Sequence, residues 1–222
     1  MKRFQDLGLR GVIFDMDGLL FDTETLYLEG WHHVGEAMGI PITREAALAT
    51  TAIADRDAEV LFQARYGPAF TLDKALPIMA NWLTEQLTEN GMPLKRGARK
   101  LVEFLHKKGV PFALGTSNRL EVAEAYLGAA ELRHYFDIVV ARDMVEAAKP
   151  APDIFLKAAD QMGFQPSECL VLEDSFVGVT AGHAAGCRTV MVPDLVQPCD
   201  EIRAKTWQVF DHLEDVHEAL FA

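Results

Sequence analysis

Short, continuous apolar runs alternate with helical stretches along most of this chain, and this alternation limits the possible folds more than any other feature. The first run, Gly11–Asp15, places Val, Ile and Phe at consecutive positions, as in a strand that is buried on both faces. Four later runs look alike: Phe112–Thr116, Ile138–Val140, Cys169–Glu173 and Thr189–Val192. Buried strands separated by helices predict right-handed crossovers and a doubly wound, Rossmann-like α/β sheet.

The stretches between these runs have apolar residues at helical spacing, and each is followed closely by a glycine. Glycine tolerates the positive φ that a helix C-terminus often requires, so the glycines mark the expected helix ends. The predicted helices are Gly97–Lys108, Leu120–Leu127, Ile154–Met162 and Phe176–Ala185, followed by Gly109, Gly128, Gly163 and Gly186. A last helix is expected within Asp211–Ala222.

The segment 22–92 interrupts the alternation, because it contains no apolar strand run. Amphipathic helices are predicted there at Leu26–Met38, Asp55–Tyr66 and Leu76–Leu87. We therefore expect two domains: an α/β core formed by residues 1–21 and 93–222, and a helical domain formed by residues 22–92, inserted after the first strand.

The net charge and the cysteine content limit the classes of partner and of metal site that the chain can have. The formal net charge of −12 over 222 residues disfavours a nucleic-acid polymer or an anionic membrane as partner, but it allows a small anionic substrate in a locally cationic site. Three cysteines without a CxxC pair give neither a zinc signature nor a disulfide framework. With no signal-peptide pattern and no apolar run of membrane-spanning length, we expect a cytoplasmic protein. A monomer is the expected state.

Polar residues gather where the predicted strands end. In open α/β sheets the carboxyl ends of the strands carry the ligand site, so these residues are the candidates for function. Each has an ordinary alternative, such as a helix cap or a solvated lysine. The candidates are Asp15, Asp17, Thr116, Ser117, Asn118, Lys149, Glu173 and Asp174.

Taken together, these residues indicate one kind of chemistry. Clustered carboxylates require a hard cation, and oxygen ligands suit Mg²⁺. A lysine and a loop of hydroxyl and amide groups facing that cluster suit a phosphoryl group. The sequence therefore predicts a site for a small phosphate ester and Mg²⁺.

The four motifs, in this order, resemble those of the haloacid dehalogenase superfamily, in the branch with a helical cap inserted after the first strand. That branch includes β-phosphoglucomutase, phosphoglycolate phosphatase and pseudouridine 5′-phosphatase. The motifs are Asp15-Met16-Asp17-Gly18 with Asp22-Thr23-Glu24, then Thr116-Ser117-Asn118, then Lys149-Pro150-Ala151-Pro152-Asp153, and finally Glu173-Asp174-Ser175 with Gly178.

The resemblance implies a role for each candidate. Asp15 attacks phosphorus and forms an aspartyl-phosphate, while Asp17 protonates the leaving alcohol and then activates water. Mg²⁺ is held by Asp15, the backbone carbonyl of Asp17, and Asp174, with Glu173 as a further ligand. The phosphoryl oxygens are held by Thr116, Lys149 and the backbone near Ser117 and Asn118.

A β-phosphoglucomutase-type mutase is the rival within this resemblance. Such relatives carry a histidine in the first cap helix, where this chain has Tyr27, and an arginine in the cap loop, where this chain has Thr50–Ile53. A missing cap cation disfavours a second phosphate, although Arg56 lies nearby. The sequence thus favours a phosphatase for a sugar phosphate, with a nucleoside monophosphate or pseudouridine 5′-phosphate second. A non-catalytic phosphate-binding protein is the alternative of another class.

Overall fold

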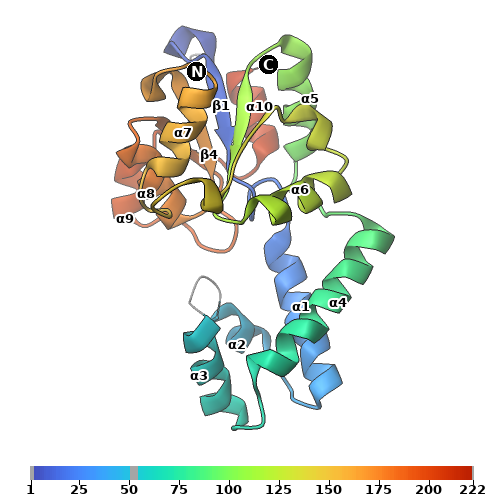
Figure 1. Ribbon diagram of the computed structural model, residues 1–222. Helices are drawn as coiled ribbons and strands as arrows, with labels where there is room; N and C mark the ends of the chain where they lie inside the picture. Colours follow the sequence, from blue (N-terminus) through green and yellow to red (C-terminus); the bar gives the residue numbers. More distant parts are fainter. Residues whose placement is uncertain (1–2, 51–54, 222) are drawn as a thin grey trace. The chain divides into compact units, whose positions relative to one another are not determined.

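The computed structural model describes residues 3–50 and 55–221 of the chain, and these fall into two compact units. The first unit comprises Met1–Asp22 with Met92–Ala222, and the second comprises Thr23–Gly91. Figure 1 labels the elements of both units. No helix within the described ranges combines the length and the apolar character needed to cross a membrane.

The first unit is built on a parallel sheet. Its described strands are β1 (Gly11–Phe14), β2 (Phe112–Gly115), β3 (Ile138–Val140), β4 (Cys169–Glu173), β5 (Arg188–Met191) and β6 (Gln208–Val209). They follow the order β3-β2-β1-β4-β5-β6, with parallel neighbours throughout. The predicted doubly wound α/β fold is confirmed, and the strand order reverses between β1 and β4, where such sheets bind ligands.

Helices pack on the sheet from both sides (Figure 1). They are α5 (Ala98–Lys108), α6 (Leu120–Ala129), α7 (Asp153–Gln161), α8 (Phe176–Ala184), α9 (Asp200–Lys205) and α10 (Leu213–Leu220). Ile13 points into a cluster shared with α7 and α8. Its neighbour Phe14 lies on the opposite face, in edge-to-face contact with Phe112 and Phe136. Both faces of β1 are therefore covered, which explains its uninterrupted apolar run.

The second unit is helical. Its elements are α1 (Thr23–Met38), α2 (Arg44–Leu48), α3 (Asp55–Tyr66) and α4 (Leu72–Asn90). Its core centres on Trp31, whose ring lies 4.6 Å from that of Phe62, with Phe70 packed beside both. The predicted bounds of α3 are correct, whereas α4 extends beyond the predicted Leu76–Leu87 at both ends, and the short helix α2 was not predicted.

One predicted helix end in the first unit is wrong. Gly128 lies inside α6, which continues to Ala129, and the backbone turns at Glu131 with a φ of 56°. Leu132, which is fully buried, follows this turn and donates its backbone N–H to Leu127. The need to bury Leu132 explains why the chain turns there, beyond the glycine. The elements α9 and β6 were also not predicted.

Candidate active site

Pairing between neighbouring strands of the sheet brings two of the predicted acids together. Phe14 of β1 pairs with Leu172 of β4, so the residues that follow them, Asp15 and Glu173, lie side by side. The Asp15 N–H donates to the Leu172 carbonyl at 3.0 Å, which fixes where the Asp15 side chain begins. On the other side of β1, Phe14 pairs with Leu114, and the strand β2 leads into Thr116.

Lys149 joins two of these acids in the interior. Its Nζ donates to Asp15 Oδ1, to Glu173 Oε1 at 2.8 Å, and to the carbonyl of Gly115 at 3.0 Å. The lysine side chain is only 2% exposed, and the carboxylates of Asp15 and Glu173 are 9% and 1% exposed. A buried charge is costly unless it is paired, so these three groups depend on one another.

Burial and charge shift the pKa values of this group. Burial raises the pKa of Asp15 well above its ordinary value, opposed by Lys149 and reinforced by the charges of Glu173 and Asp17. Burial also raises the pKa of Asp174, and Glu173 and Asp15 add to the effect. Burial opposes the charge on Lys149, but Asp15 and Glu173 outweigh it and raise the pKa of the lysine, which therefore stays charged.

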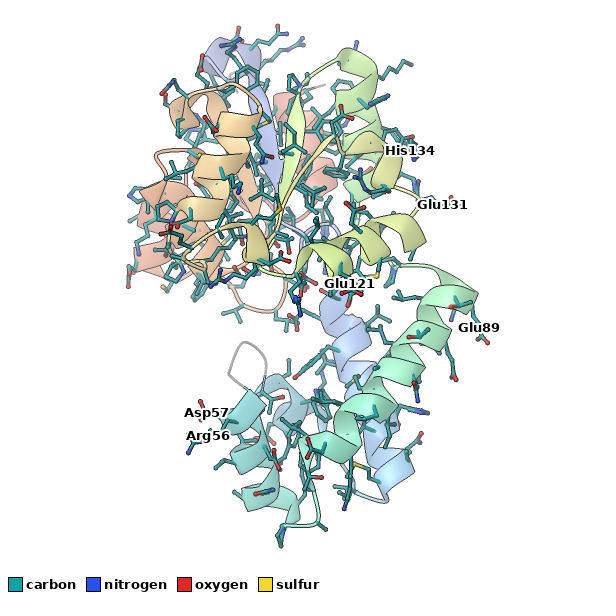
Figure 2. All side chains as sticks on the ribbon, viewed as in Figure 1. Arg56, Asp57, Glu89, Glu121, Glu131 and His134 are labelled. Carbon is teal, nitrogen blue, oxygen red and sulfur yellow. The ribbon has the colours of Figure 1, made fainter. Side chains whose placement is uncertain are left out.

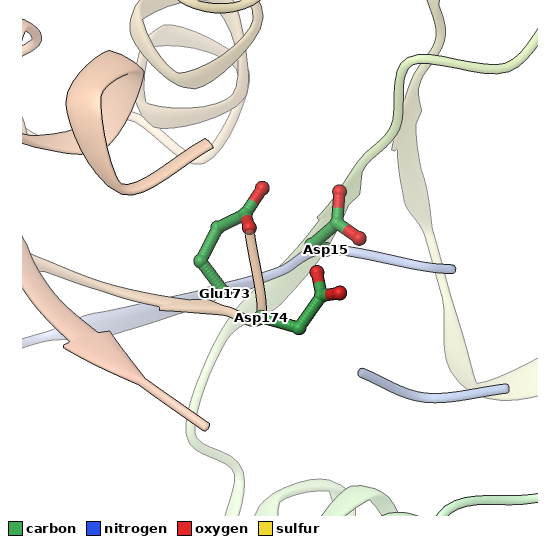
Figure 3. Close-up of side chains that lie close together, drawn as sticks. All are labelled: Asp15, Glu173 and Asp174. Atoms are coloured by element: carbon green, nitrogen blue, oxygen red, sulfur yellow. The ribbon is translucent and has the colours of Figure 1, made fainter. Parts of the chain in front are cut away.

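Three carboxylates converge at the ends of β1 and β4. Asp15, Glu173 and Asp174 each offer an oxygen atom, and these atoms lie within 4.8 Å of one another (Figure 3). A set of carboxylate oxygens at this spacing fits a hard divalent cation such as Mg²⁺ and offers no nitrogen or sulfur ligand that would favour zinc. Burial, and then the neighbouring negative charges, raise the pKa values of Asp15 and Asp174, and a bound cation would offset both effects.

Glu173 is held by the start of the next helix. Its Oε2 accepts hydrogen bonds from the backbone N–H of Ser175 at 2.8 Å and from the Ser175 hydroxyl at 2.9 Å. The same hydroxyl accepts the N–H of Gly178 and so caps α8. A Cβ on Gly178 would lie 1.6 Å from Glu173 Oε1, so only glycine lets the carboxylate rest against this turn.

We therefore expect Gly178→Ala to destabilise the protein by about 3 kcal/mol, because Glu173 would be driven away from Lys149. Gly128→Ala is the matched control. Gly128 lies in another helix of the same unit, α6, and a Cβ at this position would meet nothing within 4 Å. The control should gain about 0.5–1 kcal/mol, as expected for alanine in place of glycine in a helix. Denaturant unfolding measures both, and equal effects of the two substitutions would contradict this account.

The loop after β2 faces Asp17. The Asn118 side-chain amide donates to Asp17 Oδ2 at 2.6 Å, and the Asn118 N–H donates to the Thr116 hydroxyl at 3.0 Å. Thr116 is fully buried, whereas Ser117 is exposed. The Thr116 hydroxyl thus accepts one hydrogen bond and has a hydrogen of its own to donate, and the side-chain amide of Asn118 holds the Asp17 carboxyl.

The sequence candidates therefore come from neighbouring strand ends, and the structure adds residues that sequence reasoning missed. Ser175 anchors Glu173, and Tyr126 of α6 lies near Asp17, where burial and then the Asp17 charge raise the pKa of the phenol to about 12. The sequence gives little indication that Ser175 and Tyr126 lie at the site. A serine before a helix is usually a helix cap, and Tyr126 lies in an ordinary amphipathic pattern.

In the helical unit, Thr50 is the one residue of the cap-loop segment 50–53 that lies within the described residues. Its hydroxyl donates to the carbonyl of Ala47 at 2.7 Å and lies 3.2 Å from the Tyr27 hydroxyl. Thr51, Ala52 and Ile53 lie outside the described residues. Arg56 is exposed at the beginning of α3, next to Asp57 (Figure 2).

Comparisons with known proteins show which proteins the chain is similar to. A family model described as haloacid dehalogenase-like hydrolase matches residues 9–186. Fructose-1-phosphate phosphatase YqaB of Escherichia coli is 37% identical over 187 residues, which cover 82% of this chain and 95% of that protein. A probable pseudouridine-5′-phosphatase of Drosophila melanogaster is 38% identical over 191 residues, covering 82% of this chain and 80% of that protein.

Among solved structures, one described as a putative beta-phosphoglucomutase from Thermotoga maritima superposes with a TM-score of 0.83 at 27% identity. The match covers 95% of this chain and 98% of that structure.

Proposed function

Because this chain belongs to the haloacid dehalogenase-like hydrolase family and is a phosphatase, we propose that it hydrolyses the phosphomonoester of a small metabolite with Mg²⁺ as cofactor. The observation that carries the proposal is the buried Asp15–Lys149–Glu173 arrangement beside Asp174, with Asp17 two residues along from Asp15. The predicted family membership is confirmed by the match over residues 9–186.

Asp15 is the proposed nucleophile. Its carboxylate oxygen forms a bond to phosphorus as the bond to the substrate oxygen breaks, which leaves an aspartyl-phosphate on the enzyme. Lys149 contacts Asp15 directly and offsets the repulsion between the carboxylate and the phosphate. The buried Thr116 hydroxyl donates a hydrogen bond to a phosphoryl oxygen, and the backbone N–H groups near Ser117 and Asn118 bind the others.

Asp17 is the proposed acid and base. It gives its proton to the departing substrate oxygen and then takes one from the water that attacks the aspartyl-phosphate, which releases inorganic phosphate and restores Asp15. The hydrogen bond from Asn118 at 2.6 Å supports this role, because it fixes the position of the Asp17 carboxyl.

The proposed Mg²⁺ ligands are Asp15, Asp174, the backbone carbonyl of Asp17, and Glu173. When bound, the ion would compensate the carboxylates and the negative charge of the phosphate. Glu173 also keeps Lys149 in place through its Oε1 atom, so it contributes to both the cation site and the phosphate site.

We propose a phosphorylated sugar as the first substrate class, supported by the 37% identity with the fructose-1-phosphate phosphatase. Pseudouridine 5′-phosphate or a nucleoside monophosphate is the second, supported by the Drosophila relative. The helical segment 22–92 is proposed to act as the cap that selects among them.

A phosphosugar mutase is the second candidate function, because the solved structure with a TM-score of 0.83 is described as a putative beta-phosphoglucomutase. Hydrolysis is preferred since neither Tyr27 nor the segment 50–53 supplies a cation for a second phosphate.

A phosphate-release screen tests the proposal. Purified protein with Mg²⁺ is expected to release phosphate from fructose 1-phosphate or another sugar phosphate, and to lose this activity when EDTA removes the ion. Pseudouridine 5′-phosphate, nucleoside monophosphates and phosphoglycolate complete the panel. Conversion of β-glucose 1-phosphate to glucose 6-phosphate without phosphate release would instead establish the mutase. Phosphate binding without any turnover would establish a binding protein.

A further inference from the structure

A second lysine, Lys95, lies among acids beside the candidate cation site. Its Nζ donates to Asp194 Oδ1 at 2.6 Å and lies 3.7 Å from Asp22 Oδ1. The side chains of Lys95, Asp194 and Asp22 are 27%, 11% and 33% exposed. Burial opposes the charge on Lys95, but these acids outweigh it and raise the pKa of the lysine, so it stays charged at neutral pH.

Asp194 reaches the same space as the cation ligand Asp174. A Cβ on Gly18 would lie 2.2 Å from Asp174 Oδ2 and 3.2 Å from Asp194 Oδ2, so both oxygens converge over this glycine. Asp194 Oδ2 is buried and has no hydrogen-bond partner among the described residues, whereas Asp194 Oδ1 is bound to Lys95. Asp194 Oδ1 is therefore bound to the lysine, whereas Oδ2 lies over Gly18 together with Asp174 Oδ2.

Lys95 also lies in one of two chain segments that pair with each other next to the boundary between the units. Its backbone N–H donates to the carbonyl of Leu20 at 2.9 Å, and the Asp22 N–H donates to the carbonyl of Pro93 at 3.0 Å. Phe21 and Leu94 form an antiparallel bridge between these segments. The backbone from which the Lys95 side chain extends is thus fixed by this pairing.

We propose that Lys95 is a positioning residue that neutralises Asp194 and so keeps it from acting as an additional ligand beside Asp174, which sets the affinity and the selectivity of the cation site. The inference rests on the proposed Mg²⁺-dependent function. Lys149 pairs Asp15 with Glu173 in the same way that Lys95 pairs Asp194 with Asp22, so each lysine compensates two acids. Asp174 is then left to the divalent ion.

The proposal predicts that substitutions of Lys95 and of Asp194 change the cation affinity in opposite directions. Lys95→Met removes a positive charge and frees the Asp194 carboxylate, so divalent cations should bind more tightly. Ca²⁺ should gain more than Mg²⁺, because Ca²⁺ accepts additional carboxylate ligands and flexible geometry, whereas Mg²⁺ requires a compact octahedron. Asp194→Asn leaves Lys95 less compensated near Asp174, so both ions should bind more weakly.

Isothermal titration calorimetry with MgCl₂ and with CaCl₂ measures these changes in cation affinity directly, without an activity assay. We expect the Ca²⁺ affinity to rise roughly tenfold in Lys95→Met and to fall roughly tenfold in Asp194→Asn. The double variant should return to within roughly threefold of the wild type, because the lysine and the acid are removed together. Lys95→Arg, which keeps the charge, should bind both ions like the wild type.

Lys107→Met is the matched control, since it removes an exposed lysine from the last turn of α5. It should change neither affinity beyond roughly twofold, because solvent screens an exposed charge. Weaker binding in both Lys95→Met and Asp194→Asn, or no change in either folded variant, would overturn the proposal. Phosphate release by the wild type with Mg²⁺ would still support the proposed function in that case, so the two failures are distinguishable.

Discussion

Replacing Asp15 with asparagine is expected to lower phosphate release by roughly 10⁴-fold or more while the protein remains folded. An amide oxygen is too weak a nucleophile to form the phosphoryl bond, so the first chemical step is lost. The fold should persist because Lys149 keeps its bonds to Glu173 and to the carbonyl of Gly115. Steady-state phosphate release and circular dichroism measure the two expectations.

The matched control for this substitution is Asp137→Asn. Asp137 is an exposed acid just before β3, and its replacement makes the same chemical change outside the site. Its activity should stay within roughly twofold of the wild type, as expected of a surface substitution. Substantial activity in folded Asp15→Asn would exclude Asp15 as the nucleophile, whatever the control shows.

Replacing Lys149 with methionine is expected to cost about 3–5 kcal/mol of folding free energy in EDTA near neutral pH. The substitution leaves Asp15 and Glu173, two acids with 9% and 1% exposed side chains, without their shared cation. An uncompensated buried charge is the physical reason for a loss of this size. Turnover should also fall, because the contact that offsets repulsion at Asp15 is removed.

The loss should depend on pH with a definite sign. The pKa of Asp15 in the folded protein lies above its ordinary value of 3.8 because of burial, and removing Lys149 raises it further. The folded state of the variant therefore binds a proton that the unfolded state does not, and its free energy of unfolding falls as pH rises through this window. The deficit relative to wild type should shrink at mildly acidic pH.

Urea unfolding in EDTA at about pH 8 and about pH 5.5 measures this dependence. Lys74→Met serves as the control, because Lys74 is exposed on α4, and it should change stability by about 0.5 kcal/mol at most. A deficit that is the same at both pH values, or absent in the presence of EDTA, would show that the lysine does not compensate the two buried acids.

Much of the α/β core and of its site could be predicted because the signals are local. A run such as Gly11–Asp15 is apolar at each position before its acid, since β1 is covered on both faces and the acid begins where that cover ends. Parallel register then brings Asp15 beside Glu173 without further information. The register of a parallel sheet therefore explains why these two acids, far apart in the sequence, lie together.

Other features escaped prediction because their cause is not local. Gly128 looked like a helix end, yet α6 passes through it, because the chain turns only where Leu132 returns to the core. The edge strand β6 has two half-buried residues, too few to form a recognisable pattern. Lys95 and Asp194 are 99 residues apart, and only the folded backbone shows that they form a pair.

The most direct test of the central claim is to trap the phosphorylated enzyme. Wild-type protein is mixed with Mg²⁺ and the best substrate of the screen, quenched in acid during turnover, digested and analysed by mass spectrometry. The account predicts a phosphoryl group on the peptide that contains Asp15, located at Asp15 by fragmentation and absent from Asp15→Asn. A turning-over wild-type enzyme that carries the phosphoryl group on another residue would contradict it.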